Sequence, residues 1–215
     1  MNMFKILTIL LFICSIFFSS VFGSSDESGN NFEKNQIFAT PSLTDSNVAF
    51  YEGIELSYIF RAPGDLILLI DEPIRNGYSL AFVENNLTYD LSEIRIDITI
   101  IDVKNSFKDF NLSKFISAEL KEIKMHFGEL SEISFVDSVL SRSMEKIPTF
   151  FINNPGLFIP NVMIAYFSDD QELIIFELSI KEGYPRFEAE KIFIQLLQEF
   201  KSLKKKEKDK LAEKK

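Results

Sequence analysis

The sequence predicts an α+β domain in which a mostly antiparallel β-sheet carries two main helices. Short apolar segments with a period of two are separated by Gly, Pro, Asn and Asp, which is typical of antiparallel strands and hairpins. Two longer segments, residues 112–127 and 186–203, instead space their apolar residues three and four apart, as amphipathic helices do. No break in composition interrupts residues 37–203, so we expect them to form one domain.

The first predicted strands precede residue 104. Ile54 to Phe60 alternates apolar and polar side chains, which predicts a half-buried strand, and Leu66 to Ile70 is an apolar run short enough for a buried strand. Asp71-Glu72-Pro73 is expected to end that run, and Tyr78 to Val83 forms the next strand. The strongest strand is Glu93 to Val103, in which one face carries Ile94, Ile96, Ile98 and Ile100.

The first predicted helix spans residues 112–127. Asn111 or Ser113 can cap its start, and Gly128 is a natural stop just beyond it. The residues that recur at helical spacing form one apolar stripe: Phe115, Ile116, Leu120, Ile123 and Phe127.

More strands and a last helix follow. Residues 133–143 and 147–152 are predicted strands, and Pro148 favours an edge position for the second. Residues 161–167 and 172–180 form a predicted hairpin whose second strand, apolar on both faces, should be central. The last helix starts near Arg186, and we expect Lys201 to Lys215 to extend it without packing on anything. Its stripe is Phe187, Phe193, Leu196, Leu197, Phe200 and Leu203.

From Ile94 onward this order of elements resembles the PsbP-like fold, which is shared with the periplasmic DcrB-type proteins. The matching elements are the isoleucine strand, the helix from Leu112, the two strands after it, the hairpin and the closing helix. The resemblance implies a non-enzymatic role in the cell envelope or in complex assembly. It carries over no functional residue, because no motif matches residue by residue.

The first 23 residues have the pattern of a secretory signal peptide. Lys5 precedes an apolar stretch that ends in small residues, and cleavage is predicted before Ser24. The alternative is an uncleaved N-terminal membrane anchor. Lipidation at Cys14 is not expected, because the residue before it, Ile13, is large. Residues 24–36 are polar and are interpreted as a flexible linker. Because of the signal peptide, the protein is predicted to be exported to the periplasm or the extracellular space.

The charge is distributed unevenly along the chain. The formal net charge is −9, which argues against a nucleic-acid binder. Residues 201–215 nevertheless hold eight Lys against three acidic residues. Residues 204–215 are therefore interpreted as a basic, solvated tail, and weak contact with an anionic membrane surface is the functional alternative.

No residue is assigned a catalytic, cofactor-binding or metal-binding role. The chain has one Cys and one His, and His126 is interpreted as a favourable charge at a helix end. Carboxylates form the remaining candidate groups, and Asp97 and Asp102 should lie on opposite faces of one strand. The others are Asp71 with Glu72, and a predicted solvated hairpin turn with Asp169, Asp170 and Glu172.

Three functions remain open at the level of sequence. The first is an exported, non-enzymatic accessory or assembly protein that binds an envelope protein through a sheet edge or a groove. The alternative is a carrier of a small apolar ligand, suggested by the 23 Phe residues. A third hypothesis is a hydrolase that uses two carboxylates.

Overall fold

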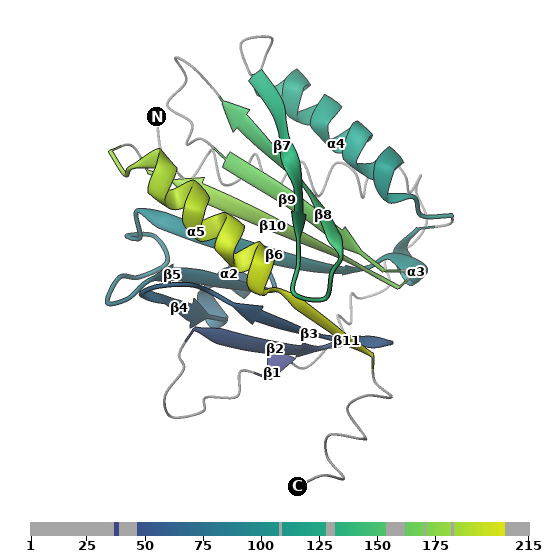
Figure 1. Cartoon of the computed structure of the whole chain (residues 1–215), viewed down its shortest axis with the longest axis horizontal. Helices are drawn as coiled ribbons and strands as arrows, with labels where there is room; N and C mark the ends of the chain where they lie inside the picture. The colour runs from purple at the N-terminus through teal and green to yellow at the C-terminus, as the bar shows by residue number, and fades with distance from the viewer. Residues whose placement is uncertain are drawn as a thin grey trace, which may run out of the picture. The chain divides into compact units, whose positions relative to one another are not determined.

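The strands form two antiparallel sheets, one of four strands and one of seven (Figure 1). This computed structural model describes residues 37–38, 47–107, 109–127, 132–153, 162–169, 171–181 and 183–204. The predicted signal peptide with Cys14, the linker and the tail after Lys204 lie outside the described residues. Antiparallel sheets combined with helices confirm the predicted α+β class.

The larger sheet has the strand order β4-β5-β6-β10-β9-β8-β7. Strands β6 and β10 lie side by side in it, with Ile98 opposite Phe176, which confirms the expected inner position of both. The strands are β4 (Leu66–Leu69), β5 (Leu80–Glu84), β6 (Ile94–Asp102), β7 (Glu132–Leu140), β8 (Lys146–Asn153), β9 (Val162–Ser168) and β10 (Glu172–Ile180).

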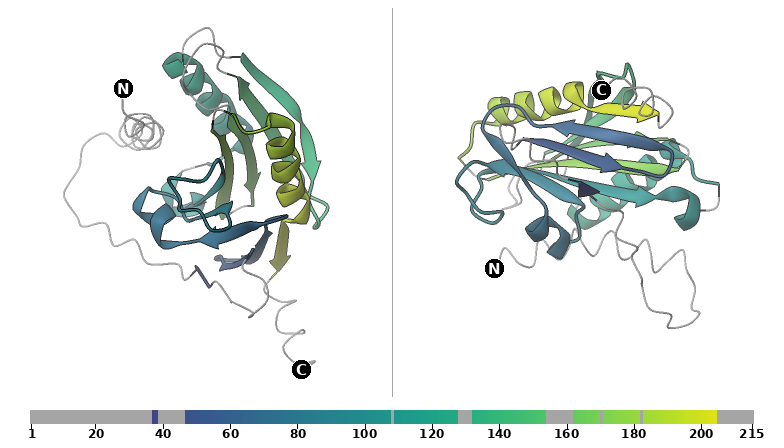
Figure 2. Two further views of the ribbon diagram at one scale, coloured as in Figure 1. Left: turned by 90° about the vertical axis from the view of Figure 1, so that its left-hand side faces the viewer. Right: turned by 90° about the horizontal axis from the view of Figure 1, so that it is seen from below.

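The two long helices, α4 (Leu112–Phe127) and α5 (Arg186–Glu199), lie on opposite faces of this sheet (Figure 2). Successive side chains of a strand point to opposite faces, so each inner strand contributes to two apolar clusters. Phe193, Leu196 and Leu197 of α5 join the cluster that contains the isoleucines of β6. Ile116 and Ile123 of α4 join the cluster of Leu173 and Ile175.

A side-chain cap marks the start of α4. The Asn111 side-chain oxygen accepts a hydrogen bond from the Lys114 backbone N–H at 3.0 Å, so Asn111 is the N-cap of α4. Two short helices were not predicted: α2 (Asp71–Arg75), where only a strand end was expected, and α3 (Val103–Ser106). None of the helices in the described ranges is both long and apolar enough to cross a membrane.

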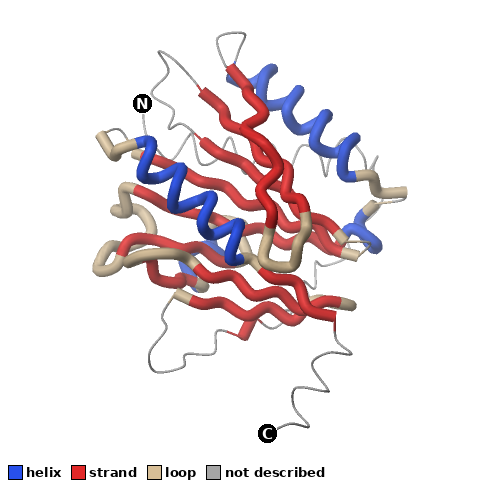
Figure 3. Tube along the Cα trace, viewed as in Figure 1, coloured by secondary structure: helices blue, strands red, loops and turns tan. Residues whose placement is uncertain are grey.

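The smaller sheet joins the two ends of the domain (Figure 3). It consists of β1 (Ile37–Phe38), β2 (Val48–Glu52), β3 (Leu56–Arg61) and β11 (Lys201–Lys204). The prediction that residues 201–203 continue the last helix is wrong, because α5 ends at Glu199 and β11 pairs with β3. The backbone becomes extended at Phe200, whose fully buried ring lies 5.4 Å from that of Phe60, between centroids.

The predicted edge position of residues 147–152 is also wrong. Strand β8 has β7 on one side and β9 on the other, so β7 is the edge. Pro148 itself lies just outside the pairing with β9, which begins at Thr149, and has a partner only on the β7 side, Ser138. The hairpin that β7 makes with β8 thus extends the sheet beyond the proline.

Truncation separates β11 from the tail after it. A chain that ends at Lys204 should keep its melting temperature within a few degrees, because it retains every residue of β11. A chain that ends at Phe200 loses the pairing with β3 and the hydrogen bond from the Ser202 hydroxyl to Glu145 at 3.0 Å. We expect its Tm to fall by about 5 °C in circular dichroism melts. Equal melting of the two truncated chains would contradict the contribution of β11.

Candidate functional site

A cluster of buried polar side chains joins the two sheets where β10 begins. The Tyr58 hydroxyl of β3 lies 2.6 Å from Asp169 Oδ2 and 2.9 Å from Glu172 Oε2. The Tyr51 hydroxyl of β2 donates to Glu172 Oε1 at 3.2 Å. Glu172 is 1% exposed, so the prediction of a solvated turn is wrong for this residue. Asp169 is also bonded rather than free in solvent, whereas Asp170 lies outside the described residues.

Burial controls the protonation of this cluster. It raises the pKa of Glu172, and the nearby charge of Asp169 raises it further, while hydrogen bonds from Tyr58 and the Ile54 backbone N–H oppose the shift. Burial also raises the pKa of Tyr58, so its hydroxyl keeps its proton. The single hydroxyl hydrogen of Tyr58 is shared between the carboxyl groups of Asp169 and Glu172. The arrangement holds the sheets together.

Two substitutions test this connection. Tyr58→Phe keeps the ring but removes the hydroxyl that bridges Asp169 and Glu172, so Glu172 keeps only the donors of Tyr51 and Ile54. This loss should cost about 2 kcal/mol and lower the Tm by about 5 °C. Gly53→Ala should also destabilise the protein, because the added Cβ would lie 2.0 Å from Glu172 Oε2. The control is Tyr184→Phe, whose hydroxyl makes no hydrogen bond within the described ranges. A Tm loss no larger for Tyr58→Phe than for this control would show that the cluster contributes nothing.

A second buried group lies on the opposite face of the seven-stranded sheet. Asp97 of β6 is fully buried, with its carboxylate 2.7 Å from Arg95 Nε and accepting a hydrogen bond from the Tyr89 hydroxyl at 2.8 Å. The Arg95 guanidinium lies over the Tyr89 ring, 4.2 Å from its centroid. Burial disfavours the ionised form of Asp97, and the positive charge of Arg95 stabilises that form.

Two more carboxyls lie near this pair. Glu177 of β10 is opposite Asp97 in the strand register. Burial, with the charges of Asp97 and Glu119, raises the pKa of Glu177 to about 8. Burial raises the pKa of Glu119 on α4 to about 7, although a hydrogen bond from Tyr166 opposes the shift. Both glutamates hold their protons more tightly than usual because burial disfavours their charged forms.

The other candidate carboxylates are dispersed. Asp102 is separated from Asp97, caps α3 and accepts a hydrogen bond from the Asn105 backbone N–H at 3.0 Å. Glu72 accepts one from the Tyr89 backbone N–H at 3.0 Å, and Asp71 is exposed. His126 is in the last turn of α4, and its side chain is outside the described residues. Within the described ranges, no group of three His, Cys, Asp or Glu side chains is placed to hold a metal ion.

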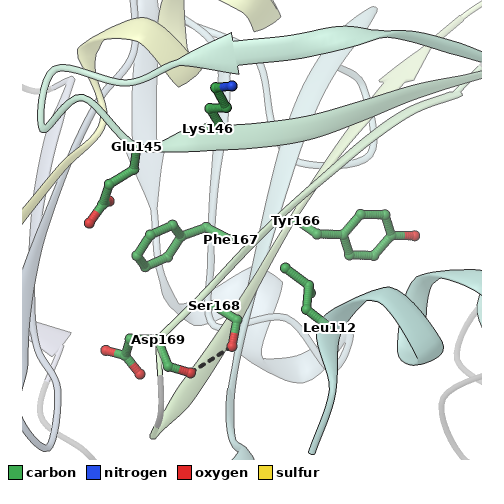
Figure 4. A pocket seen from close by; sticks show the side chains of 7 residues that line it. All are labelled: Leu112, Glu145, Lys146, Tyr166, Phe167, Ser168 and Asp169. Atoms are coloured by element: carbon green, nitrogen blue, oxygen red, sulfur yellow. Dashed lines mark hydrogen bonds between the residues drawn. The ribbon is translucent and has the colours of Figure 1, made fainter.

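A cavity of about 400 Å³ opens between α4 and the ends of β8 and β9 (Figure 4). It brings together two carboxylates, Glu145 and Asp169, which the sequence did not associate. Burial raises the pKa of Glu145, and the charge of Asp169 adds to that shift, while a hydrogen bond from Ser202 lowers it. Its other lining residues are Leu112, Lys146, Tyr166, Phe167 and Ser168. The lining of the cavity is therefore a mixture of polar and apolar side chains.

Strand β7 exposes large apolar side chains at the end of the sheet. Phe135 is 57% exposed, Val136 46% and Leu140 45%. A bulge between Phe135 and Asp137 interrupts its pairing with β8. The Phe135 ring lies 5.3 Å, between centroids, from that of Phe150 on β8, so this exposed side chain is held against the sheet. Exposed apolar groups on an edge strand are typical of an interaction surface.

Sequence reasoning missed the buried polar groups, although a signal for them was present. Glu177 interrupts the apolar run of residues 173–178 in β10, and Asp97 lies within the isoleucine strand. A charge in a strand covered on both faces needs a partner. Tyr51 and Tyr58 gave a similar signal, because a buried tyrosine hydroxyl usually finds a hydrogen-bond partner.

Comparison with known proteins gives a likeness of fold. No protein-family model matches the sequence, and no curated protein matches it. The chain is similar to the solution structure of cyanobacterial PsbP (CyanoP) from Synechocystis sp. PCC 6803, with a TM-score of 0.45 and 11% sequence identity. The similarity covers 84% of this chain and 98% of that chain. The matched protein is a PsbP, and the predicted order of elements resembles the PsbP-like fold. It concerns the fold alone, so function has to be argued from the residues of this chain.

Proposed function

We propose that the chain is an exported, non-enzymatic accessory or assembly protein that acts by binding another envelope protein along β7. The observation that carries this proposal is the exposure of Phe135, Val136 and Leu140 on an edge strand. Apolar side chains in such a position lose contact with water when a partner covers them, which favours association. The predicted signal peptide supports a partner outside the cytoplasm.

The competing functions have less support from the described residues. An apolar-ligand carrier needs a largely apolar pocket, whereas the cavity near Tyr166 is lined by Glu145, Lys146 and Asp169 as well as by apolar groups. A carboxylate hydrolase is favoured by the pairing of Glu145 with Asp169 in that cavity. Both carboxylates, however, make structural hydrogen bonds: Glu145 with Ser202, and Asp169 with Tyr58.

Site-specific photo-crosslinking in the native host tests the proposal. A photo-reactive amino acid at Val136 should form a discrete adduct with one partner protein, identified by mass spectrometry. The matched control is the same amino acid at Leu91, which is 63% exposed and lies in the loop before β6. Phe135→Ser in the Val136 derivative should reduce the adduct several-fold at equal protein level. The same adducts from both positions, or none from Val136, would overturn the proposal.

A further inference from the structure

We propose that the partner supplies an extended segment that pairs with β7 as an added antiparallel strand, and that this segment alternates apolar with basic residues. The inference rests on the proposed function, because it assumes that a partner binds at β7, and it adds the chemistry of that partner. Strand addition joins two proteins by backbone hydrogen bonds, and the side chains next to them select the sequence.

The lengths of the edge strands single out β7. In the described ranges the seven-stranded sheet ends at β4 and β7, and the four-stranded sheet ends at β1 and β11. Strand β4 has 4 residues, β1 has 2 and β11 has 4, whereas β7 has 9. Short edge strands offer few backbone groups for pairing with another chain. Strands β1, β4 and β11 are protected in this way, whereas the longer β7 is not.

The two faces of β7 differ in chemistry. Ile133 and Phe135 lie opposite Ile152 and Phe150 of β8, on the face that α4 covers elsewhere. Glu132 lies opposite Asn153 and Asp137 opposite Thr149, on the other face. Residues opposite each other in antiparallel strands share a face. An added strand therefore meets apolar neighbours on one face and carboxylates on the other.

An aromatic row on the first face extends to this edge. Ring centroids are 5.3 Å apart for Phe135 and Phe150, 6.1 Å for Phe150 and Tyr166, and 6.3 Å for Tyr166 and Phe115. Phe135 ends the row with 57% of its surface exposed. An apolar side chain of the added strand next to Phe135 would continue it and bury that surface.

Charge decides between a foreign segment and a second copy of this chain. Strand β7 has the sequence EISFVDSVL, with two carboxylates and no Lys or Arg. A second copy would bring the same acidic strand against Glu132 and Asp137, and like charges on paired strands are unfavourable. A segment with Lys or Arg at every second position supplies the opposite charge. We therefore expect the partner segment to be basic.

Peptide binding to the purified protein tests the partner's chemistry. The probe is a fluorescent peptide of nine residues that alternates valine and lysine, to match the length of β7. One comparison peptide has the same composition with the lysines grouped at one end, and another alternates valine and glutamate. By fluorescence anisotropy, the alternating valine–lysine peptide should bind about tenfold more tightly than either. Equal binding of the alternating and grouped peptides would overturn strand addition.

Charge reversal at β7 provides the matched control. Asp137→Lys should weaken the valine–lysine peptide several-fold and favour the valine–glutamate peptide, whereas Glu188→Lys, an equal charge change at an exposed position on α5, should alter neither. The same loss in both variants would show general attraction to an acidic protein and overturn the inference. A β7 dimer in sedimentation runs of the protein alone would overturn it in favour of a second copy. If Val136 still crosslinks a partner while the peptides show no preference, the proposed function stands and the strand chemistry is wrong.

Discussion

Replacing Phe193 by Asp is expected to unfold the protein, whereas the same replacement at Phe187 should leave it folded. Both residues are on α5, but Phe193 is fully buried and Phe187 is 77% exposed. Phe193 packs between the sheets in the cluster that contains Ile96 and Ile98. Asp at this position would remove the ring and bury an unpaired carboxylate, at a cost of more than about 4 kcal/mol, which is a large share of the stability of a domain.

Far-ultraviolet circular dichroism and urea unfolding provide the measurement. Ile98→Asp on β6 should act like Phe193→Asp, because Ile98 is also fully buried in the same cluster. Phe187→Asp should unfold within about 1 kcal/mol of the parent protein, as exposed substitutions usually do. A cooperative, near-native unfolding curve for Phe193→Asp would mean that α5 does not pack against the sheet as described.

The second large effect is a loss of stability as the pH rises from about 5 to about 9. The pKa of Glu177 is raised to about 8 and that of Glu119 to about 7, in both cases mainly by burial, from an ordinary value of 4.5. Between these pKa values and the unfolded value, the folded state binds more protons than the unfolded state. The contribution of these two glutamates to stability is therefore fully present below about pH 4.5 and is lost as the pH rises through neutral, by a few kcal/mol in total.

Substitution by Gln identifies the groups responsible. Glu177→Gln and Glu119→Gln keep the shape of the side chains but remove their titration, so the double variant should lose most of this pH dependence. Urea unfolding at fixed pH values gives the free energy of unfolding for each protein. The control is Glu188→Gln on α5, which is exposed and should keep the slope of the parent. If stability instead rises between pH 5 and pH 8, the burial of the two glutamates is wrong.

The regular elements were predictable because their signals are local. The period of two in the isoleucine strand correctly predicts β6, and Asn111 is one of the two caps predicted for α4. The errors occur where a distant segment decides. Residues 201–204 have the pattern of a helix continuation, but pairing with β3 makes them a strand. Pro148 predicts an edge strand, but β7 lies outside β8 and is the edge.

The α+β class, the two long helices and the inner position of β6 and β10 follow from local sequence patterns, because periodicity and apolar runs report which faces are buried. Which polar groups meet depends instead on the packing of distant segments, that is, on tertiary packing. Tyr58 and Glu172 are 114 residues apart, and Glu119 and Glu177 come from different elements, yet each set is buried together. Tertiary packing also decides that β7, rather than β8, is exposed at the edge, because a strand's neighbours depend on the whole sheet and not on its own residues.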